Sequence, residues 1–353
     1  MIPFQFHTFL RLLTTDGPMA AKGWNGKLRR GAFFLLFPLF EMVNATLLTL
    51  DSLFFRFRDV KVVSPIFIMS SPRSGSTMLH RILALDGERF TAFRLWQSIF
   101  PNLLTQSFVR RMARIDQRFG GRMRRRLDAA QDRDLREADR FHKIRLTEVE
   151  EDEVLLVHAV ASELLANVFP IPEIWREYRR FDALPDRQRR ALMGFYRSCV
   201  QRHLLLEGTG RRFLSKNPPF CHKIGSLYET FPDARFVLLV RNPVEAICSL
   251  LSMLAAFRSS QGIESATLEH PARDDEAVNF ALDCYRNAFR AFENLPPSCY
   301  LIVRYEDLVA SPKGTVERIY QQFGVPITDA FRQTLEAEEA RAKGYKSRHH
   351  YAP

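Results

Sequence analysis

The sequence predicts an α/β protein: a doubly wound parallel sheet flanked by helices, with helical insertions and a helical N-terminal extension. Two observations favour this class. Short apolar runs alternate with segments whose apolar residues recur at helical spacing, and polar or basic residues follow several of the runs, as at the strand ends of an open sheet. The chain has 353 residues, of which 46% are apolar and 26% charged, which is enough to bury a substantial core.

Residues 1–60 are predicted to form the helical N-terminal extension, packed on the core. The stretch 32–55 is richly apolar, but Pro38, Glu41, Asn44 and Asp51 interrupt it, which argues against a membrane-spanning helix. Because Arg29 and Arg30 precede the stretch, an interfacial anchor with peripheral membrane contact stays open as the alternative.

The cysteine pattern and the start of the chain favour a cytoplasmic protein. Five cysteines occur without a Cys-x-x-Cys pair, so neither a zinc site nor a disulfide framework is indicated. The first residues lack a basic start followed by a sustained apolar core and a small-residue cleavage site, so no secretory signal is predicted.

Residues 65–85 predict a strand, a tight polar loop and a helix. The strand covers residues 66–69 and the helix residues 77–85. Gly75 allows the backbone to turn, so that successive N–H groups and the helix N-terminus converge on an anion. Further donors come from the loop side chains Arg73, Ser74, Ser76 and Thr77. We expect this loop to bind a phosphate or a sulfate.

The loop departs from that of nucleotide hydrolases, which ends in Gly-Lys-Ser/Thr. Here Ser76 replaces the lysine, and the cation stands three residues earlier, at Arg73. A nucleotide kinase-like enzyme also needs a metal-binding carboxylate at the end of a second strand, whereas the candidate strand ends in Arg241. The kinase alternative is therefore weakened.

The middle of the chain carries an aromatic segment and an arginine-rich segment. Residues 93–101 are predicted to lie mostly in the core, with the wall of an acceptor pocket as the alternative. Residues 110–126 contain eight arginines against one aspartate and are split by Gly120 and Gly121 into two helical pieces. Such a charge run is usually a solvated face, although it could attract an anionic lipid or polymer.

An acidic cluster follows, comprising Glu148, Glu150, Glu151, Asp152 and Glu153. It precedes a predicted apolar helix over residues 154–165, whose dipole it would complement. A buried member of the cluster could instead serve as a general base.

Two further strands place cations at their carboxyl ends, where open α/β sheets bind ligands. After a core-facing helix over residues 186–206, the strand 213–217 carries Lys216, and the strand 234–240 is followed by Arg241. Pro243 opens the next helix, which carries Ser249. The remainder predicts a helix over 276–294, a strand over 299–304, a turn over 305–308 and a helix over 312–323.

Three separated motifs together resemble the P-loop sulfotransferases, which use 3′-phosphoadenosine 5′-phosphosulfate (PAPS). They are Ser-Pro-Arg-Ser-Gly-Ser-Thr at 71–77, Ser-Lys-Asn-Pro at 215–218, and Phe-Pro-Asp-Ala-Arg-Phe-Val-Leu-Leu-Val-Arg-Asn-Pro at 231–243, followed by Ser249. The resemblance runs from about residue 60 to residue 350 and is greatest to bacterial sulfotransferases and their tyrosylprotein relatives. It implies a P-loop domain over 61–353, with a helical acceptor-side insertion over 105–205.

The resemblance also implies roles for the matched residues. Residues 73–77, namely Arg73, Ser74, Gly75, Ser76 and Thr77, would hold the 5′-phosphosulfate. Arg241 and Ser249 would hold the 3′-phosphate, and Lys216 would lie beside the bridging oxygen. Lys346 and Ser347 resemble a C-terminal loop that contacts the nucleotide.

Two residues depart from the family pattern. Ser70 stands where many relatives have glycine. Gln97 stands where relatives often have glutamate, and an amide cannot accept a proton at neutral pH. The catalytic base must therefore lie elsewhere; Glu151 is our first choice, with Glu150, Glu153, His80 and His142 as alternatives.

The expected activity is metal-independent, in-line transfer of a sulfuryl group from PAPS to a hydroxyl of a small molecule, a glycan or a lipid. A non-enzymatic anion-binding or nucleic-acid-binding protein would explain the net charge of +11. It would leave the three motifs unexplained, so no nucleic-acid partner is expected. The acceptor and the oligomeric state stay open.

Overall fold

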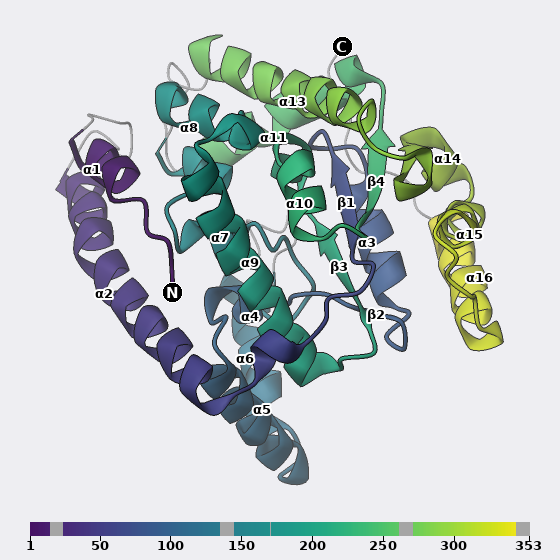
Figure 1. Ribbon diagram of the computed structural model, residues 1–353, viewed down its shortest axis with the longest axis horizontal. Helices are drawn as coiled ribbons and strands as arrows, with labels where there is room; N and C mark the ends of the chain where they lie inside the picture. Colours follow the sequence, from purple (N-terminus) through teal and green to yellow (C-terminus); the bar gives the residue numbers. More distant parts are fainter. Residues whose placement is uncertain (15–23, 135–144, 170, 261–270, 344–353) are drawn as a thin grey trace.

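The computed structural model describes residues 1–14, 24–134, 145–169, 171–260 and 271–343. Its centre is a five-stranded parallel sheet in the order β2-β3-β1-β4-β5 (Figure 1). The strands are β1 (Ile66–Ser70), β2 (Phe90–Thr91), β3 (Arg212–Lys216), β4 (Arg235–Val240) and β5 (Tyr300–Arg304). The predicted parallel α/β architecture is confirmed.

Helices connect and cover the strands. They are α1 (Phe6–Thr14), α2 (Trp24–Phe54), α3 (Ser76–Ala84), α4 (Leu95–Ile99), α5 (Leu103–Arg118), α6 (Arg122–Asp134), α7 (Val154–Val157), α8 (Pro172–Tyr178), α9 (Asp186–Glu207), α10 (Ile224–Thr230), α11 (Pro243–Ser260), α13 (Pro271–Phe292), α14 (Tyr305–Ala310), α15 (Pro312–Gln322) and α16 (Asp329–Lys343). Short 3-10 turns are η1 (Phe57–Asp59), η3 (Glu163–Asn167), η4 (Phe181–Ala183), η5 (Pro218–His222) and η6 (Pro297–Cys299).

Alternate residues of β1 face two separate cores, as expected for a strand covered on both faces. Ile66 and Ile68 belong to a core that includes residues of α3, α15 and α16. Phe67 and Met69 belong to the other core, with residues of α9, α10 and α13. All five residues of β1 are buried, so its carboxyl end opens from the centre of the protein.

The N-terminal segment is helical, as predicted, over the described parts of residues 1–60. Leu12 of α1 and Leu48 of α2 belong to the same core as Phe67, so this segment packs on the domain. Figure 1 shows α2 along one edge of the molecule, with α14, α15 and α16 at the opposite edge. By length and composition alone, residues Arg30–Phe54 of α2 would be able to cross a membrane.

The arginine-rich segment forms two helices, as predicted. Gly120 and Gly121, with φ values of 82° and 66°, separate α5 from α6. These positive φ values explain why glycines stand there, since other residues rarely adopt them. The side chain of Asn102 caps α5 by accepting a hydrogen bond from the backbone N–H of Thr105 at 2.8 Å.

Two predicted elements were wrong. The helix expected over residues 154–165 ends after one turn, because Val160 has a φ of 56°. The chain then continues into η3. The turn expected over residues 305–308 is instead the start of α14.

Candidate active site

The loop between β1 and α3 has the tight conformation that the sequence predicted. Gly75 has a φ of 85°, and Arg73, unexpectedly for a residue with a side chain, has a φ of 67°. A non-glycine residue in this region is uncommon, and such strain is concentrated at functional sites. A Cβ atom at Gly75 would lie 2.9 Å from the ring of Tyr305, so both conformation and space require glycine.

The N-terminus of α3 lacks a side-chain cap. Its N-cap residue is Gly75, which has no side chain to accept a hydrogen bond from the helix. The hydroxyl of Ser70 donates to Ser76 Oγ at 3.0 Å. Within the part of the chain that the structure describes, the buried Ser71 Oγ has no hydrogen-bond partner. Uncapped N–H groups and a free hydroxyl together suit an anion with several acceptor oxygens.

Arg73, Arg241 and Ser249 meet above this loop. Arg73 Nε donates to Ser249 Oγ at 3.1 Å, and Arg241 Nη1 donates to the main-chain oxygen of Arg73 at 3.0 Å. The guanidinium of Arg241 lies 4.3 Å from the centre of the Tyr305 ring and also contacts Glu245 at 3.1 Å. The structure thus brings three of the sequence-predicted site residues together, although Ser249 is buried against Arg73.

Tyr285 and Tyr305 belong to the same cluster, and the sequence analysis missed both. The Tyr285 hydroxyl lies 3.3 Å from Ser74 Oγ, accepts a hydrogen bond from the Arg241 N–H at 3.2 Å and donates to the Arg241 carbonyl at 3.1 Å. Tyr305 directly follows β5, so its position at the carboxyl end of a strand could have identified it as a candidate site residue. Tyr285 lies inside α13, and nothing local in the sequence distinguishes it.

Lys216 stands at the carboxyl end of β3, as predicted. Only 2% of its side chain is exposed, and Nζ donates to Glu151 Oε1 at 2.7 Å. β1 separates β3 from β4, so Lys216 and Arg241 lie on opposite sides of the loop that follows β1. Glu151, our first choice for the base, is therefore held beside the lysine that the resemblance places at the bridging oxygen.

His80 of α3 is the second base candidate that the structure brings to this region. Burial, with smaller contributions from the charges of Lys216 and Arg81, lowers the pKa of His80 to about 3. Among the described residues neither of its ring nitrogens has a hydrogen-bond partner. A neutral imidazole has one donor and one acceptor to satisfy, so a ligand or a water molecule here would find both.

The other acidic residues of the cluster have structural partners. Glu148 and Glu150 lie 3.1 and 3.8 Å from Arg81. Asp152 accepts hydrogen bonds from Tyr196, Ser215 and Asn217. These contacts tie the segment that carries Glu151 to β3 and α9.

Glu153 is buried 3.4 Å from Lys223. Burial raises the pKa of Glu153 to about 7, although the charge of Lys223 acts in the opposite direction. A fully buried carboxyl group paired in this way is less accessible to an acceptor than Glu151.

Gln97 helps to build the local fold. Its side-chain oxygen accepts a hydrogen bond from the Arg94 N–H at 2.9 Å, and its amide nitrogen donates to Glu207 at 2.8 Å. Lys346, Ser347 and His142 lie outside the described residues, so their predicted roles stay predictions.

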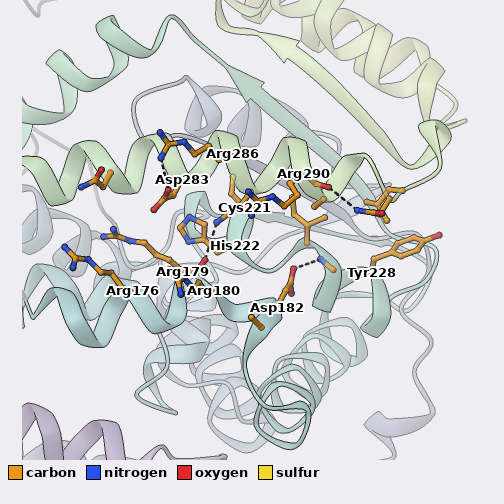
Figure 2. A pocket seen from close by; sticks show the side chains of 18 residues that line it. Arg176, Arg179, Arg180, Asp182, Cys221, His222, Tyr228, Asp283, Arg286 and Arg290 are labelled. Atoms are coloured by element: carbon orange, nitrogen blue, oxygen red, sulfur yellow. Dashed lines mark hydrogen bonds and ion pairs between the residues drawn. The ribbon is translucent and has the colours of Figure 1, made fainter.

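A separate cavity of about 890 Å³ lies on another side of α13. Arginines from both walls surround it: Arg176, Arg179 and Arg180 on one side, and Arg286 and Arg290 of α13 on the other (Figure 2). Residues 71–77, Lys216 and Arg241 do not line this cavity. On α13 its lining residues lie more than a quarter turn from Tyr285, so the cavity is distinct from the loop site.

Comparisons with known proteins agree with this geometry. A family model described as the Sulfotransferase family matches residues 65–329, which are 265 of the 353 residues. The chain therefore belongs to the sulfotransferase family. It is an enzyme that transfers a sulfuryl group to a hydroxyl acceptor.

Two curated relatives carry the name omega-hydroxy-beta-dihydromenaquinone-9 sulfotransferase Stf3. They come from Mycobacterium bovis and Mycobacterium tuberculosis, and each is 26% identical over 329 residues, covering 90% of this chain and 78% of the relative.

The fold is similar to solved sulfotransferase structures. STF1 from Mycobacterium tuberculosis superposes with a TM-score of 0.71 at 22% identity, covering 97% of this chain and 88% of that chain. STF9 from Mycobacterium avium superposes with a TM-score of 0.61 at 18% identity, covering 81% of this chain and 70% of that chain.

Proposed function

We propose that the sulfuryl donor is PAPS and that Arg73, Ser74, Gly75, Ser76 and Thr77 hold its 5′-phosphosulfate. The observation that carries this proposal is the convergence of the uncapped loop with cations that follow two flanking strands. Lys216 ends β3 and Arg241 follows β4, on either side of β1. Fixed cations and oriented N–H groups stabilise the negative charge that develops during such a transfer.

The residues present fit this donor. Ser71 Oγ and the ring nitrogens of His80 are buried polar atoms without partners among the described residues, and bound oxygen atoms or water would satisfy them. We propose that Arg241 and Ser249 hold the 3′-phosphate, because both lie beside Arg73 of the loop. Ser249 Oγ accepts a hydrogen bond from Arg73 in the present structure, and in the proposed role its hydroxyl would donate to the phosphate.

Glu151 is the proposed base and Lys216 the proposed positive charge at the bridging oxygen. When bound, the donor supplies an activated sulfuryl group. Glu151 would accept the proton of the acceptor hydroxyl, and Lys216 would stabilise the oxygen that carries the departing charge. Their present ion pair of 2.7 Å would hold both side chains at the site.

We further propose that the acceptor is a lipid that carries a hydroxyl group. The curated relatives are named for a hydroxylated menaquinone, and a long apolar acceptor favours an enzyme that works in the cytoplasm at the membrane surface. We propose no metal, since the strand that would present a metal-binding carboxylate is followed by Arg241.

Mass spectrometry tests this function. Purified enzyme is incubated with PAPS and omega-hydroxylated menaquinone, with unhydroxylated menaquinone as the matched control. The expected result is a sulfated product from the hydroxylated lipid alone, together with 3′-phosphoadenosine 5′-phosphate. Release of that nucleotide with a glycan or a small polar alcohol, and none with the lipid, would overturn the acceptor proposal while leaving the donor proposal intact.

A further inference from the structure

Helix α2 places its acidic side chains toward the protein and many apolar side chains outward, while Leu48 still packs in the core. Its two acidic residues in the stretch 31–54, Glu41 and Asp51, are both buried. Glu41 contacts His158 at 2.8 Å, and Asp51 contacts Arg202 at 2.9 Å. An ordinary surface helix has the opposite arrangement.

The outward face of α2 carries an apolar stripe that the exposed Thr46 and Thr49 interrupt. Its exposed apolar residues include Leu35 at 67% and Phe54 at 70% exposure, and the others are Leu36, Leu39, Met42, Val43 and Leu53. At 1.5 Å per residue, a stripe from Leu35 to Phe54 is roughly 30 Å long. Exposed apolar residues gathered along one face of a helix indicate an interaction site.

The polar groups on the exposed side of α2 bond within the helix. Thr46 Oγ1 donates to the Met42 carbonyl at 2.8 Å, and Thr49 Oγ1 donates to the Ala45 carbonyl at 2.7 Å. Back-bonding of this kind satisfies a hydroxyl without water. Between residues 31 and 54 of α2, the exposed threonine hydroxyls are therefore satisfied within the helix and their methyl groups add to the apolar surface.

Arginines lie on α5 and α6, the two helices of the arginine-rich segment. α5 packs against α2, and Figure 1 shows it next to the C-terminal part of α2. Within the described ranges no ion pair or hydrogen bond involves the side chains of five exposed arginines of α5 and α6: Arg111, Arg114, Arg118, Arg122 and Arg126. Exposed apolar residues stand among them, including Phe119 at 76% exposure.

We propose that the outward face of α2 and the arginines of α5 and α6 form a docking surface for an anionic lipid bilayer. α2 would lie flat in the interface, with its apolar face in the acyl boundary and the arginines near the headgroups. Apolar area together with basic residues is the combination that holds interfacial helices on membranes.

Two observations favour a bilayer surface over a membrane-spanning arrangement of α2 and over a second copy of the chain. Crossing the bilayer would require α2 to leave the protein and break the pairs of Glu41 and Asp51, which would expose charges to lipid. The acidic residues of α2 between residues 31 and 54 are buried, so a second copy packed on this face would bring no exposed carboxylate of α2 to these arginines, whereas an anionic bilayer supplies counter-charges.

Co-sedimentation with vesicles tests the proposal, and it requires neither donor nor turnover. The full chain is mixed with vesicles of phosphatidylcholine containing phosphatidylglycerol and with vesicles of phosphatidylcholine alone. We expect strong binding only to the anionic vesicles, weakened by salt. We expect Arg111→Glu/Arg114→Glu to weaken binding at least about tenfold, since each basic residue near the surface contributes about 1 kcal/mol. We expect Leu39→Glu/Met42→Glu to weaken binding at least about tenfold as well, because it removes apolar contact and adds charge that the anionic lipid repels.

Two control substitutions on other helices test whether any added glutamate on the surface weakens vesicle binding. Val309→Glu on α14 and Arg332→Glu on α16 change exposed residues at the opposite edge, and should leave vesicle binding unchanged. Circular dichroism confirms that each variant is folded. Equal binding by wild type and both double variants would overturn the proposal. The proposal would also be overturned if the wild type were a dimer that does not bind vesicles and if the Leu39→Glu/Met42→Glu variant were a monomer.

Discussion

Arg241 donates a hydrogen bond from Nη1 to the main-chain oxygen of Arg73 at 3.0 Å. The side chain expected to hold a phosphate of the donor therefore also holds the loop that receives the phosphosulfate. Tyr285 strengthens this link, because its hydroxyl contacts both Ser74 and the backbone of Arg241. Loss of either side chain should affect the loop as well as any direct contact.

Arg241→Ala should weaken binding of 3′-phosphoadenosine 5′-phosphate by about 100-fold, since a charge-assisted contact to phosphate is worth about 2–3 kcal/mol. The same substitution should weaken the binding of adenosine 5′-phosphosulfate only several-fold, because it disturbs the loop that Arg241 contacts. Calorimetry with both nucleotides measures the difference. Arg235→Ala, at the opposite end of β4, is the control. Equal losses for the two nucleotides would show that Arg241 acts on the loop alone.

Glu151→Gln should reduce turnover by about 100-fold or more, as expected for loss of a general base, while donor affinity is kept. The affinity for the donor should be kept because the substitution removes a negative charge beside Lys216. Glu148→Gln, which changes a partly exposed partner of Arg81, is the matched control. If Glu151→Gln turns over normally and His80→Ala does not, the base is the histidine.

Tyr285→Phe should weaken donor binding by about 5- to 10-fold, since a single hydrogen bond contributes about 1 kcal/mol. The ring stays, so only the bridging hydroxyl is lost. Tyr228→Phe, which alters a residue of the separate cavity, should leave the affinity unchanged. An unchanged affinity in Tyr285→Phe would mean that the bridge does not shape the binding loop.

Buried neutral histidines should make the fold sensitive to acid. Burial lowers the pKa of both His80 and His203 to about 3 from 6.5. Between these values the unfolded chain binds protons that the native state does not, so stability is present above about pH 6.5 and is lost as the pH falls. Each histidine contributes a slope of up to about 1.4 kcal/mol per pH unit.

Urea unfolding between about pH 7 and about pH 5.5 measures this slope. Two groups oppose the loss in this window. Against burial, the charge of Glu163 raises the pKa of His222 to about 10, and burial raises the pKa of Glu153 to about 7, so near neutral pH the native state binds protons at both groups that the unfolded chain does not. The contribution of one neutral histidine is therefore the difference between wild type and His203→Gln, which should lose about 1 kcal/mol less stability over this range. Equal changes in the free energy of unfolding for the two proteins would contradict the assignment of a neutral buried His203.

Sulfuryl transfer should continue in EDTA, because the proposed site stabilises charge with Arg73 and Lys216 and has no carboxylate directly after β4. The rate of nucleotide release is compared before and after chelation. Activity that disappears in EDTA and returns on addition of Mg²⁺ would show that a metal takes part.

The strands and the binding loop could be predicted from the sequence because their signals are local. A buried apolar run, Gly75 and a cation at each strand end are read within a few residues. The contact between Glu151 and Lys216 joins segments 65 residues apart, so only folding shows it. Periodicity also could not reveal the positive φ of Val160, which ended the helix expected over 154–165.

The polarity of α2 shows a different limit of sequence analysis. In the sequence, Glu41 and Asp51 argue against a spanning helix, and this stays a prediction. The sequence could not show that His158 and Arg202 contact them inside the protein, because those partners lie far along the chain. These contacts lie on the inner side of α2, whereas several of its apolar side chains are exposed.

The most direct test of the donor site is calorimetric titration of the metal-free enzyme with 3′-phosphoadenosine 5′-phosphate and, separately, with ATP. The loop around Arg73, with Lys216 and Arg241 on either side, predicts that the 3′-phosphorylated nucleotide binds at least about 100-fold more tightly, a difference of about 2.7 kcal/mol. ATP binding as tight or tighter would contradict the proposed donor and the roles given to these three residues.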